Sequence, residues 1–510
     1  MSAAASLLVA IVVAGCGSTT YFAGRTLPPS GLRNRVLITI QNPSSSSTGT
    51  AQFVDAYYDI RYVYSSNNTN PAFTISGFSG SEPTTIQNMP DELFGAIYSS
   101  LSGTLALVNY AKESTSGAVG GLSGLYSSVF ITSNQLYTFG TSQTSNVLTV
   151  VDKSGSTTTS YNFAAPVKLY RVSVNSGGSV ALVFAQNSNY VYYPRKLTAA
   201  ETTAYSSGST SWPKAAVDCE PQSGPAWCLF QAESPDHVDA TGNAYGAPLT
   251  FDMPVKAVFS ADGGTAYVLN CGPECGGTKA AVTSLSIAPF IFLTGQESGS
   301  LPTQSTLESN TLAIPGGASN ALVNSSTLYV AGQCVASTTL SSAQLPQCSG
   351  AAPSSGSIFT GTLTVVTLPA GSTTTMTAAS PVSISDGYPG AISRMVLADD
   401  NTLWIGMTKC TDGERAAAGL SVGCLTMVNI ADPASPVATL MPYNSDATGI
   451  AAVTGLHKIY TAEGGQVYIY ATGGSWTPGT AINNYYVTVP GTAYDVAYMD
   501  ATSASDTTDY

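Results

Sequence analysis

The sequence predicts an all-β fold, a single β-propeller of about eight four-stranded blades. Three observations lead to this prediction. Short strands separated by tight turns recur along the chain, a strand–hairpin–strand unit repeats at intervals of about 40 residues or more, and the two chain ends carry complementary parts of one blade. Helical periodicity is almost absent, and the best helix candidate is one short stretch at residues 197–205.

The repeat unit is a strand, a turn rich in Gly, Asp or Asn, and a second strand. These turn residues favour hairpins because such turns need positive φ. The clearest copies are residues 170–184, 255–269 and 393–406. Weaker copies lie at residues 319–330, 449–460 and 127–139, with a fourth at residues 93–108. Small antiparallel sheets repeated in this way predict propeller blades.

The two ends of the chain predict how the ring closes. Residues 493–500 resemble the innermost strand of a blade that has no other strands after it. Residues 35–41, 52–59 and 73–77 resemble the second, third and fourth strands of a blade that has no first. One blade built from both termini leaves no free sheet edge. The count is eight blades, and seven is the alternative if residues 93–108 are not a blade.

The first residues predict export. Residues 3–13 are small and apolar and are followed by Ala14-Gly15-Cys16, and Val13-Ala14-Gly15-Cys16 resembles a bacterial lipobox with Cys16 as the lipidated residue. An ordinary secretory signal with an incidental cysteine is the alternative. We therefore expect a signal peptide at residues 1–15, a tether at 16–34, the propeller at 35–500 and a polar tail at 501–510. The predicted location is the periplasmic or cell-surface side of a bacterial membrane, with Cys16 as the anchor.

The remaining cysteines support an oxidising compartment. Eight cysteines form four pairs of close sequence neighbours, and neighbour pairing is the simplest of many connectivities. The expected disulfide residues are Cys219, Cys228, Cys271, Cys275, Cys334, Cys348, Cys410 and Cys424. Zinc is disfavoured, because Cys271 and Cys275 have no second cysteine pair or nearby histidine to complete a site.

Charge excludes nucleic acid as a partner. The chain has 17 Lys and Arg against 30 Asp and Glu, a net charge of −13, and only 9% of its residues are charged. No basic patch is available to neutralise phosphates. A surface built from uncharged polar residues suits an extracytoplasmic protein.

One repeat carries a family resemblance. The segment from Val258 to Asn270, Val-Phe-Ser-Ala-Asp-Gly-Gly-Thr-Ala-Tyr-Val-Leu-Asn, resembles a blade of the bacterial YVTN-type propellers, which are similar to lactonase-like proteins. The resemblance covers about half of the chain and implies a propeller with a central channel. It carries over no catalytic residues, because no active-site motif of that family is present.

The predicted ligand site is the ring of inner-strand entrances at the channel mouth, where converging polar residues make the default binding site. Arg171 and Arg394 fall at equivalent positions of the repeat. Structural ion pairs or hydrogen bonds with neighbouring blades are the favoured role of these residues, and ligand binding is the alternative. The candidate residues are Asp91, Glu92, Arg171, Lys256, Asn320, Arg394, Asp446 and Asp495. The segment 196–253, with Trp212, Trp227 and the Cys219–Cys228 pair, interrupts the repeat and is a candidate partner-binding insertion between blades.

Evidence for catalysis is weak. Gly419-Leu-Ser421-Val-Gly423 matches the nucleophile-elbow pattern, but an apolar strand follows it in place of a helix. The chain has two histidines, His237 and His457, both expected in loops. We expect no catalytic residues, no metal and no cofactor, although scattered carboxylates leave a channel-bound divalent cation open.

The function that the sequence favours is a membrane-anchored binding or scaffolding module for a protein or glycan partner. A propeller hydrolase of lactonase-like or of metal- or quinone-dependent type is the first alternative. A structural cell-envelope or adhesion component is the second.

Overall fold

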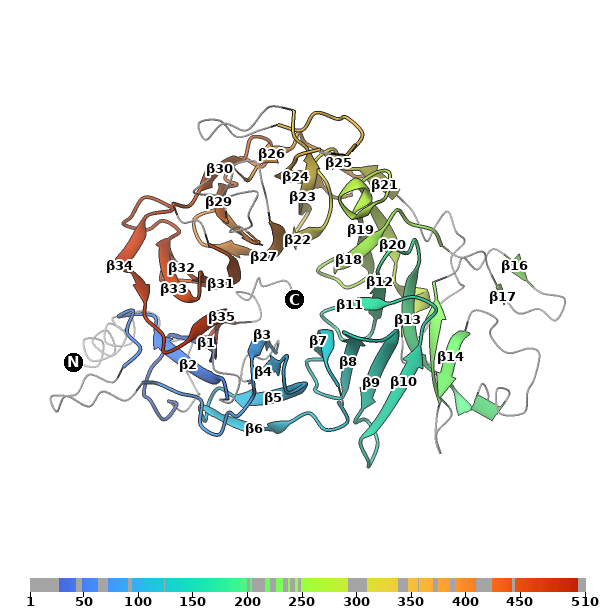
Figure 1. Cartoon of the computed structure of the whole chain (residues 1–510), viewed down its shortest axis with the longest axis horizontal. Helices are drawn as coiled ribbons and strands as arrows, with labels where there is room; N and C mark the ends of the chain where they lie inside the picture. Colours follow the sequence, from blue (N-terminus) through green and yellow to red (C-terminus); the bar gives the residue numbers. More distant parts are fainter. Residues whose placement is uncertain are drawn as a thin grey trace, which may run out of the picture.

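The chain folds into an eight-bladed β-propeller, whose small antiparallel sheets are arranged in a ring around a central opening (Figure 1). The prediction of an all-β propeller with eight blades is confirmed. The computed structural model describes residues 27–42, 48–62, 72–89, 94–122, 124–199, 202–203, 216–220, 226–232, 237–238, 244–245, 249–291, 310–337, 347–355, 357–369, 375–385, 390–409, 424–442 and 445–502.

The blades are numbered from the one that joins the termini, and in each blade the first strand named is the innermost. Blade 1 contains β35 (Thr492–Tyr498), β1 (Arg35–Gln41) and β2 (Thr50–Asp55). Blades 2 and 3 contain β3 (Pro83–Asn88), β4 (Phe94–Ser99), β5 (Thr104–Asn109) and β6 (Ser114–Ala118), then β7 (Tyr126–Ile131), β8 (Tyr137–Ser142), β9 (Val147–Asp152) and β10 (Thr159–Ala164). Blade 4 contains β11 (Leu169–Val174), β12 (Ala181–Ala185), β13 (Val191–Lys196), β15 (Trp227–Gln231) and β14 (Ala216–Glu220).

The second half of the ring follows the same plan. Blade 5 contains β18 (Pro254–Phe259), β19 (Thr265–Asn270), β20 (Ala281–Ser286) and β21 (Asn310–Ala313). Blade 6 contains β22 (Asn320–Asn324), β23 (Thr327–Val335), β24 (Phe359–Thr367), β25 (Thr377–Ala378) and β26 (Val382–Ser383). Blades 7 and 8 contain β27 (Ala391–Ala398), β28 (Thr402–Thr408), β29 (Leu425–Asn429) and β30 (Val437–Leu440), then β31 (Ala447–Val453), β32 (Lys458–Glu463), β33 (Gln466–Ala471) and β34 (Ala481–Val487). A separate pair, β16 (His237–Val238) and β17 (Ala244–Tyr245), and two short 3-10 helices, η1 (Gly272–Cys275) and η2 (Ala288–Phe290), complete the elements.

The hydrophobic core lies between neighbouring blades. In β1, Val36 and Ile38 pack against blade 8, whereas Leu37 packs against blade 2. Successive side chains of a strand point to opposite faces of its sheet. Because each blade is covered on both faces by its neighbours, strands such as β1 and β12 are almost continuously buried, and strict alternation of buried and exposed residues is lost.

The hairpins of the predicted repeat form as expected. Gly178 and Gly263 have φ of +61° and +68°, and Asp400 and Asn401 have φ of +61° and +55°. Glycine adopts this left-handed backbone freely, and Asp and Asn tolerate it better than other residues. The turn chemistry read from the sequence therefore predicts the hairpins between β11 and β12, β18 and β19, and β27 and β28.

The ring closes through the two termini, as predicted. Strand β1 pairs antiparallel with β35, with Val36 opposite Tyr498 and Ile38 opposite Val496, so the first and last strands lie side by side in Figure 1. Arg35 and Asp500 form a buried ion pair with an Nη2–Oδ1 distance of 2.6 Å. The fourth strand expected at residues 73–77 is present as a bridge between Gln52 and Thr74.

The prediction that residues 93–108 begin a blade with its innermost strand is wrong in register. These residues contain β4 and β5, the second and third strands of blade 2, and the innermost strand is β3. Only one large aliphatic side chain, Ile86, lies in β3. Gln87 and Asn88 form hydrogen bonds to neighbouring blades, so β3 lacks the apolar run that predicts an innermost strand.

The segment 196–253 is only partly an insertion. Its strand β15 pairs with β13 and is the fourth strand of blade 4, and β14 is added at the outer edge. At the helix expected for residues 197–205, the amide of Thr202 donates to the carbonyl of Thr198 at 2.9 Å, which is one α-helical turn.

The neighbour pairing of cysteines is confirmed where the structure describes both partners. Disulfides join Cys219 to Cys228, Cys271 to Cys275 and Cys334 to Cys348. Cys424 is also disulfide-bonded. Its predicted partner Cys410, like Cys16, lies outside the described residues.

Candidate ligand site at the channel mouth

The innermost strands share one irregularity near the point where each enters the ring. Strands β3, β7, β11, β18, β27, β31 and β35 each carry a β-bulge after their first residues. In β11, for example, Leu169 pairs with Ala185 and Arg171 pairs with Phe184, so Tyr170 is the extra residue. A bulge redirects the side chains beside it, and here it does so at equivalent positions around the channel.

The position directly after the bulge forms a ring of residues, one from each of these strands. We call it the post-bulge ring. It contains Thr85, Ser128, Arg171, Lys256, Arg394, Gly449 and Asp495, and β22, which has no bulge, contributes Asn320 at the aligned position. Five of the eight predicted channel-mouth residues therefore occupy one register of the repeat.

Arg394 and Asp495 form an ion pair that spans blade 8. The Nη2–Oδ2 distance is 3.0 Å, and the Asp495 side chain is 1% exposed. Gly449 makes this pair possible, because a β-carbon on Gly449 would lie 2.4 Å from Asp495 Oδ1. Burial raises the pKa of Asp495, whereas Arg394 and the backbone amides of Ile86 and Val496 favour the carboxylate.

Lys256 and Arg171 differ in their surroundings. Lys256 is buried, and its Nζ donates to Asn320 Oδ1 at 2.9 Å, which links blades 5 and 6. Arg171 is half-buried, and its guanidinium makes no hydrogen bond or ion pair within the described part of the chain. Lys256 and Arg394 therefore have the predicted structural role, in which they link different blades. The described contacts give no such role to Arg171.

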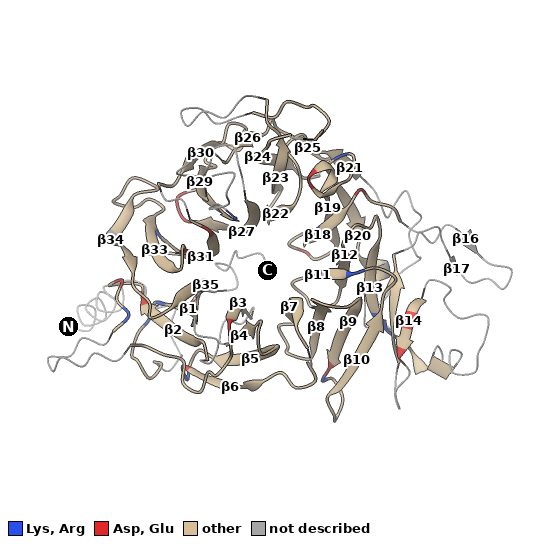
Figure 2. Cartoon of the chain, viewed as in Figure 1, with Lys and Arg blue, Asp and Glu red and all other residues tan. Residues whose placement is uncertain are grey.

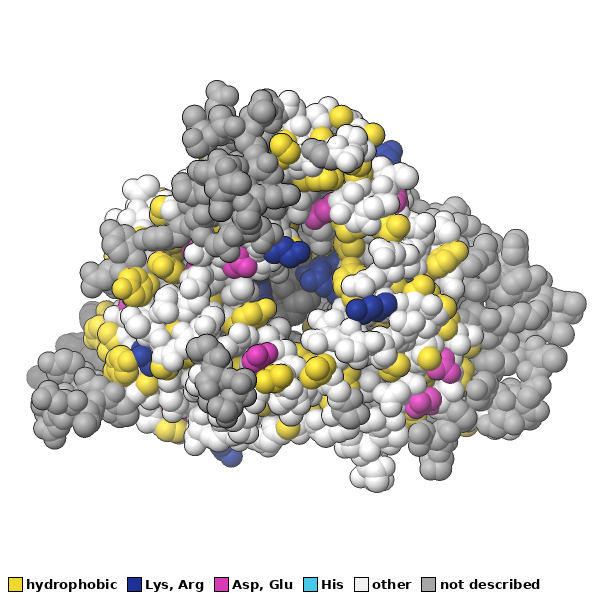
Figure 3. Space-filling view, in the orientation of Figure 1, with side chains coloured by type: hydrophobic (Ala, Val, Ile, Leu, Met, Phe, Trp, Pro, Cys, Tyr) yellow, Lys and Arg dark blue, Asp and Glu magenta, His cyan; other side chains and the backbone are white. Residues whose placement is uncertain are grey.

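Arg171, Lys256 and Arg394 line one cavity of about 410 Å³ at the channel mouth. The cavity extends between blades 2 and 3, where hydroxyl groups of Thr85, Ser127 and others line it. In the space-filling view, dark-blue side chains border the central hollow (Figure 3). Blue segments on β11 and β27 mark the same wall in the ribbon (Figure 2).

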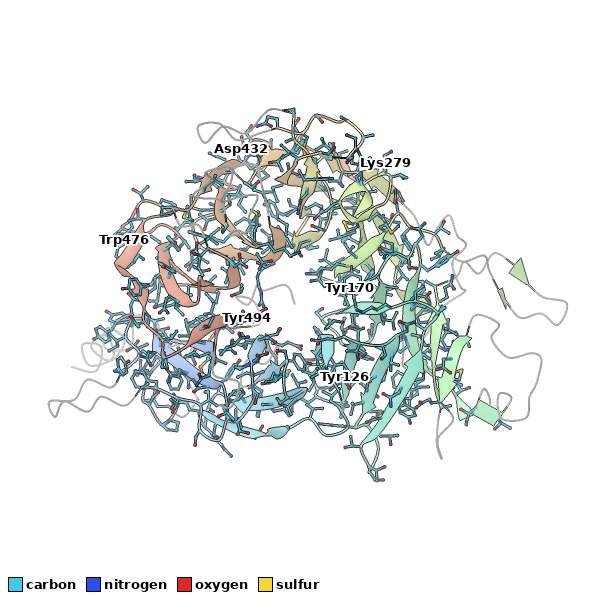
Figure 4. The ribbon with its side chains drawn as sticks, in the orientation of Figure 1. Tyr126, Tyr170, Lys279, Asp432, Trp476 and Tyr494 are labelled. Carbon is cyan, nitrogen blue, oxygen red and sulfur yellow. A yellow bond between two sulfur atoms is a disulfide. The ribbon has the colours of Figure 1, made fainter. Side chains whose placement is uncertain are left out.

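Aromatic side chains contribute to the same mouth. Tyr126 and Tyr494 line the cavity, and with Tyr170 they lie toward the central opening, unlike the labelled residues of the outer edge (Figure 4). The hydroxyl of Tyr170 donates to the carbonyl of Val255 at 2.9 Å, and burial raises the pKa of Tyr170 to about 12. Phenols in this state donate hydrogen bonds and do not ionise near neutral pH.

The remaining predicted mouth residues have separate outcomes. Asp446 is half-buried and close enough to Tyr494 to help burial and Asp495 raise its pKa. Asp91 and Glu92 lie outside the described residues, and the ring position of their blade is taken by Thr85. Within the residues that the structure describes, no three His, Cys, Asp or Glu side chains are grouped as a metal site.

Trp227 does not lie on the surface, so the partner-binding role predicted for it is wrong. Its side chain is 0% exposed, packs against Tyr137 and Tyr161, and donates from Nε1 to Asp152 Oδ2 at 3.1 Å. Trp227 is therefore a core residue of blade 4. Trp212 lies outside the described residues.

The two weak catalytic candidates gain nothing from the structure. Ser421 and its flanking glycines lie outside the described residues. His457 lies in a turn, and its Nδ1 is 2.7 Å from Asp400 Oδ2. His237 begins the short strand β16.

Sequence reasoning missed one carboxyl group beside the site. Glu274 lies in η1 between Cys271 and Cys275, and it accepts a hydrogen bond of 2.9 Å from the amide of Gln333. Burial raises the pKa of Glu274 to about 7. The signal in the sequence is the Cys-Gly-Pro-Glu-Cys motif, because the Cys271–Cys275 disulfide closes the short turn that carries Glu274.

The fold and the mouth define an eight-bladed propeller with a cationic, hydroxyl-lined channel entrance. No protein-family profile matches the chain, and no curated protein matches it. Solved structures that resemble it include hydrazine synthase of Kuenenia stuttgartiensis, at 13% identity and a TM-score of 0.42 over 80% of this chain and 99% of that one. A candidate 6-phosphogluconolactonase of Bacteroides fragilis gives 11% identity and a TM-score of 0.42 over 81% and 94%. The dihydro-heme d1 dehydrogenase NirN gives 9% identity and a TM-score of 0.46 over 93% and 79%. Similarities at this level carry no functional argument.

Among the described residues, no helix has both the length and the apolar character needed to span a bilayer.

Proposed function

We propose that this protein is an exported, lipid-anchored propeller that binds a ligand at its channel mouth on the outer side of a bacterial membrane. The observation that carries the proposal is the post-bulge ring, which gathers polar side chains from different blades into one cavity. A cavity of about 410 Å³ is within the usual range of small-ligand sites. The rigid β-ring holds its walls in place before any ligand arrives.

Binding is favoured over catalysis by the chemistry of the wall. The described residues that line the cavity are hydroxyl, amide, aromatic and cationic side chains and two valines, with no His or Cys among them. A hydrolytic site needs a nucleophile beside a general base. A glycan is favoured over a protein partner, because a concave mouth rich in hydroxyl groups and tyrosines suits a saccharide end better than a flat protein surface.

Export is supported by the disulfides, which fit an oxidising compartment, and anchoring by the lipobox-like motif that ends at Cys16. The test is mass spectrometry of the membrane fraction after expression of the full chain in a bacterium that processes lipoproteins. We expect a diacyl or triacyl mass on a peptide that begins at Cys16, and loss of the protein from the membrane fraction in C16S. An unmodified Cys16 in a cytosolic protein would contradict the proposal.

Binding at the mouth is tested on a glycan array with a cavity-filling variant. Thr85 is exposed and lines the cavity, so T85W fills the mouth without burying a polar group. T157W, in the exposed turn after β9, is the matched control. We expect T85W to lose the binding that the parent protein and T157W retain. Equal binding by all three proteins would place the ligand elsewhere.

A further inference from the structure

The charge of the channel mouth is opposite to that of the protein. The chain has a net charge of −13, yet three cations line this one cavity, and no Asp or Glu is among its described lining residues. A concave wall of one charge focuses the electrostatic potential and attracts ligands of the opposite charge. The cavity therefore favours an anion.

Arg171 is the residue that most clearly points to a ligand. Lys256 is held by Asn320 and Arg394 by Asp495, whereas Arg171 contacts no acceptor within the described chain. The residue is half-buried and lines the cavity, so a ligand in the mouth can supply the missing acceptor. Its guanidinium can bind a carboxylate through two parallel hydrogen bonds.

The fold itself does not need a cation at this position. Thr85 and Ser128 occupy the same post-bulge position in blades 2 and 3, and their strands pair with the same irregularity as β11. A small polar side chain is thus sufficient to build a blade. The arginine in blade 4 is consistent with selection by a ligand.

The rest of the wall suits a sugar. Ser127 and Thr448 present hydroxyl groups from the bulge position, and Gln143 presents an amide. Such groups pair with sugar hydroxyls, and the half-buried Tyr494 offers apolar area to a sugar ring. Asp495 already neutralises Arg394 and Asp446 lies near Tyr494. Glu274, with a pKa of about 7, lies near Tyr170, so the mouth retains at most roughly one positive charge in excess.

We propose that the channel mouth binds a small saccharide that carries a carboxylate, of the uronic-acid class, with Arg171 holding the carboxylate. This inference rests on the proposed function and names its ligand class. One carboxylate matches the excess charge better than a phosphate monoester, which carries about −1.5 to −2 at neutral pH.

The test is isothermal titration of the mature protein with D-glucuronate, D-glucose and D-glucose 6-phosphate. We expect glucuronate to bind with a Kd of about 1 mM or tighter and the other two sugars to bind more weakly. R171A should weaken glucuronate binding about 10- to 100-fold, because a charge-assisted hydrogen-bond pair is lost, and R171K should restore part of it. K279A removes an exposed cation at the outer edge and should have no effect. Affinity should fall as salt is raised.

Four results would overturn the inference: no glucuronate binding, equal binding of glucose, tighter binding of glucose 6-phosphate, or unchanged affinity in R171A. If the protein does not bind glucuronate but binds a neutral glycan, and T85W abolishes that binding, the proposed function stands and only the ligand class is wrong. An unlipidated, cytosolic Cys16 would instead remove the proposed function itself.

Discussion

The seam between the chain termini can be tested by D500N, which changes one atom of the buried ion pair that closes the ring. Asp500 Oδ2 accepts hydrogen bonds from the Arg35 amide at 2.8 Å and from its Nε at 3.0 Å, and Oδ1 accepts one from Nη2 at 2.6 Å. Both side chains are less than 5% exposed. The asparagine can keep one acceptor, but it loses the charge and turns an N–H group toward the guanidinium.

The magnitude follows from these contacts. Removing one partner of a buried ion pair costs about 3–5 kcal/mol, and we expect the lower end because Arg35 keeps Glu113 at 2.8 Å and the Tyr110 carbonyl. With an unfolding entropy of roughly 2.1 cal/mol/K per residue over roughly 470 residues, a loss of about 3 kcal/mol lowers Tm by about 3 °C.

Calorimetry at pH 7 gives the Tm, and hydrogen exchange locates the weakened region. The amides of β1 and β35 should lose protection before those of blades 4 to 6, because the seam is where the ring opens. D262N, which removes a carboxylate from the exposed turn of blade 5, is the control and should leave Tm within about 1 °C. An equal Tm for D500N and D262N, or a uniform loss of protection, would refute the idea that this pair closes the ring.

Three further predictions concern other parts of the ring. Burial raises the pKa of Glu463 to about 8, so the protonated side chain stabilises the fold fully below about pH 4.5, and this stabilisation is lost as the pH rises through 8. The free energy of unfolding should therefore fall by about 1.4 kcal/mol per pH unit over this range. Chemical denaturation should show that E463Q abolishes this fall, whereas E82Q, at an exposed position, does not. In G449A the new β-carbon meets Asp495 Cα at 2.6 Å, so we expect a loss of about 1–3 kcal/mol, whereas G120A, which meets nothing, should unfold like the parent protein. Non-reducing peptide mapping should find Cys424 linked to Cys410, and a free Cys410 thiol would contradict the predicted pairing.

The fold was largely predictable because its signals are local. Hairpin turns such as those at Gly178 and Gly263 are recognisable because they contain residues that adopt positive φ, and the hairpins that they form recur along the chain. Closure was predictable from the two incomplete blades at the ends. Strand β3 was not recognised, since Gln87 and Asn88 replace apolar residues there and their value lies in hydrogen bonds to other blades. Contacts of that kind have no periodic pattern in the sequence.

The candidate site was predictable in position but not in chemistry. Aligning the repeat with itself places Arg171 and Arg394 in one register, and the bulges show that the register is structural. The sequence did not reveal that Arg394 pairs with Asp495 across a glycine, because those residues are 101 apart along the chain. Nor did it reveal that Trp227 is inside the core, because the segment around it interrupts the repeat and so has no second copy with which to compare it.

The post-bulge ring explains how one repeated position serves two purposes. In some blades its side chain ties the ring together: Asp495 accepts the amide of Ile86 in blade 2, and Ser128 Oγ accepts the amide of Val172 in blade 4. In blade 4 the same position carries Arg171, which makes no such tie among the described residues and lines the cavity. Since the bulge is set by the backbone of the inner strand, the residue after it can change without altering the pairing of the blade. Recognition at the mouth can therefore be tuned one blade at a time, and a change of Arg171 should alter the ligand before it alters the fold.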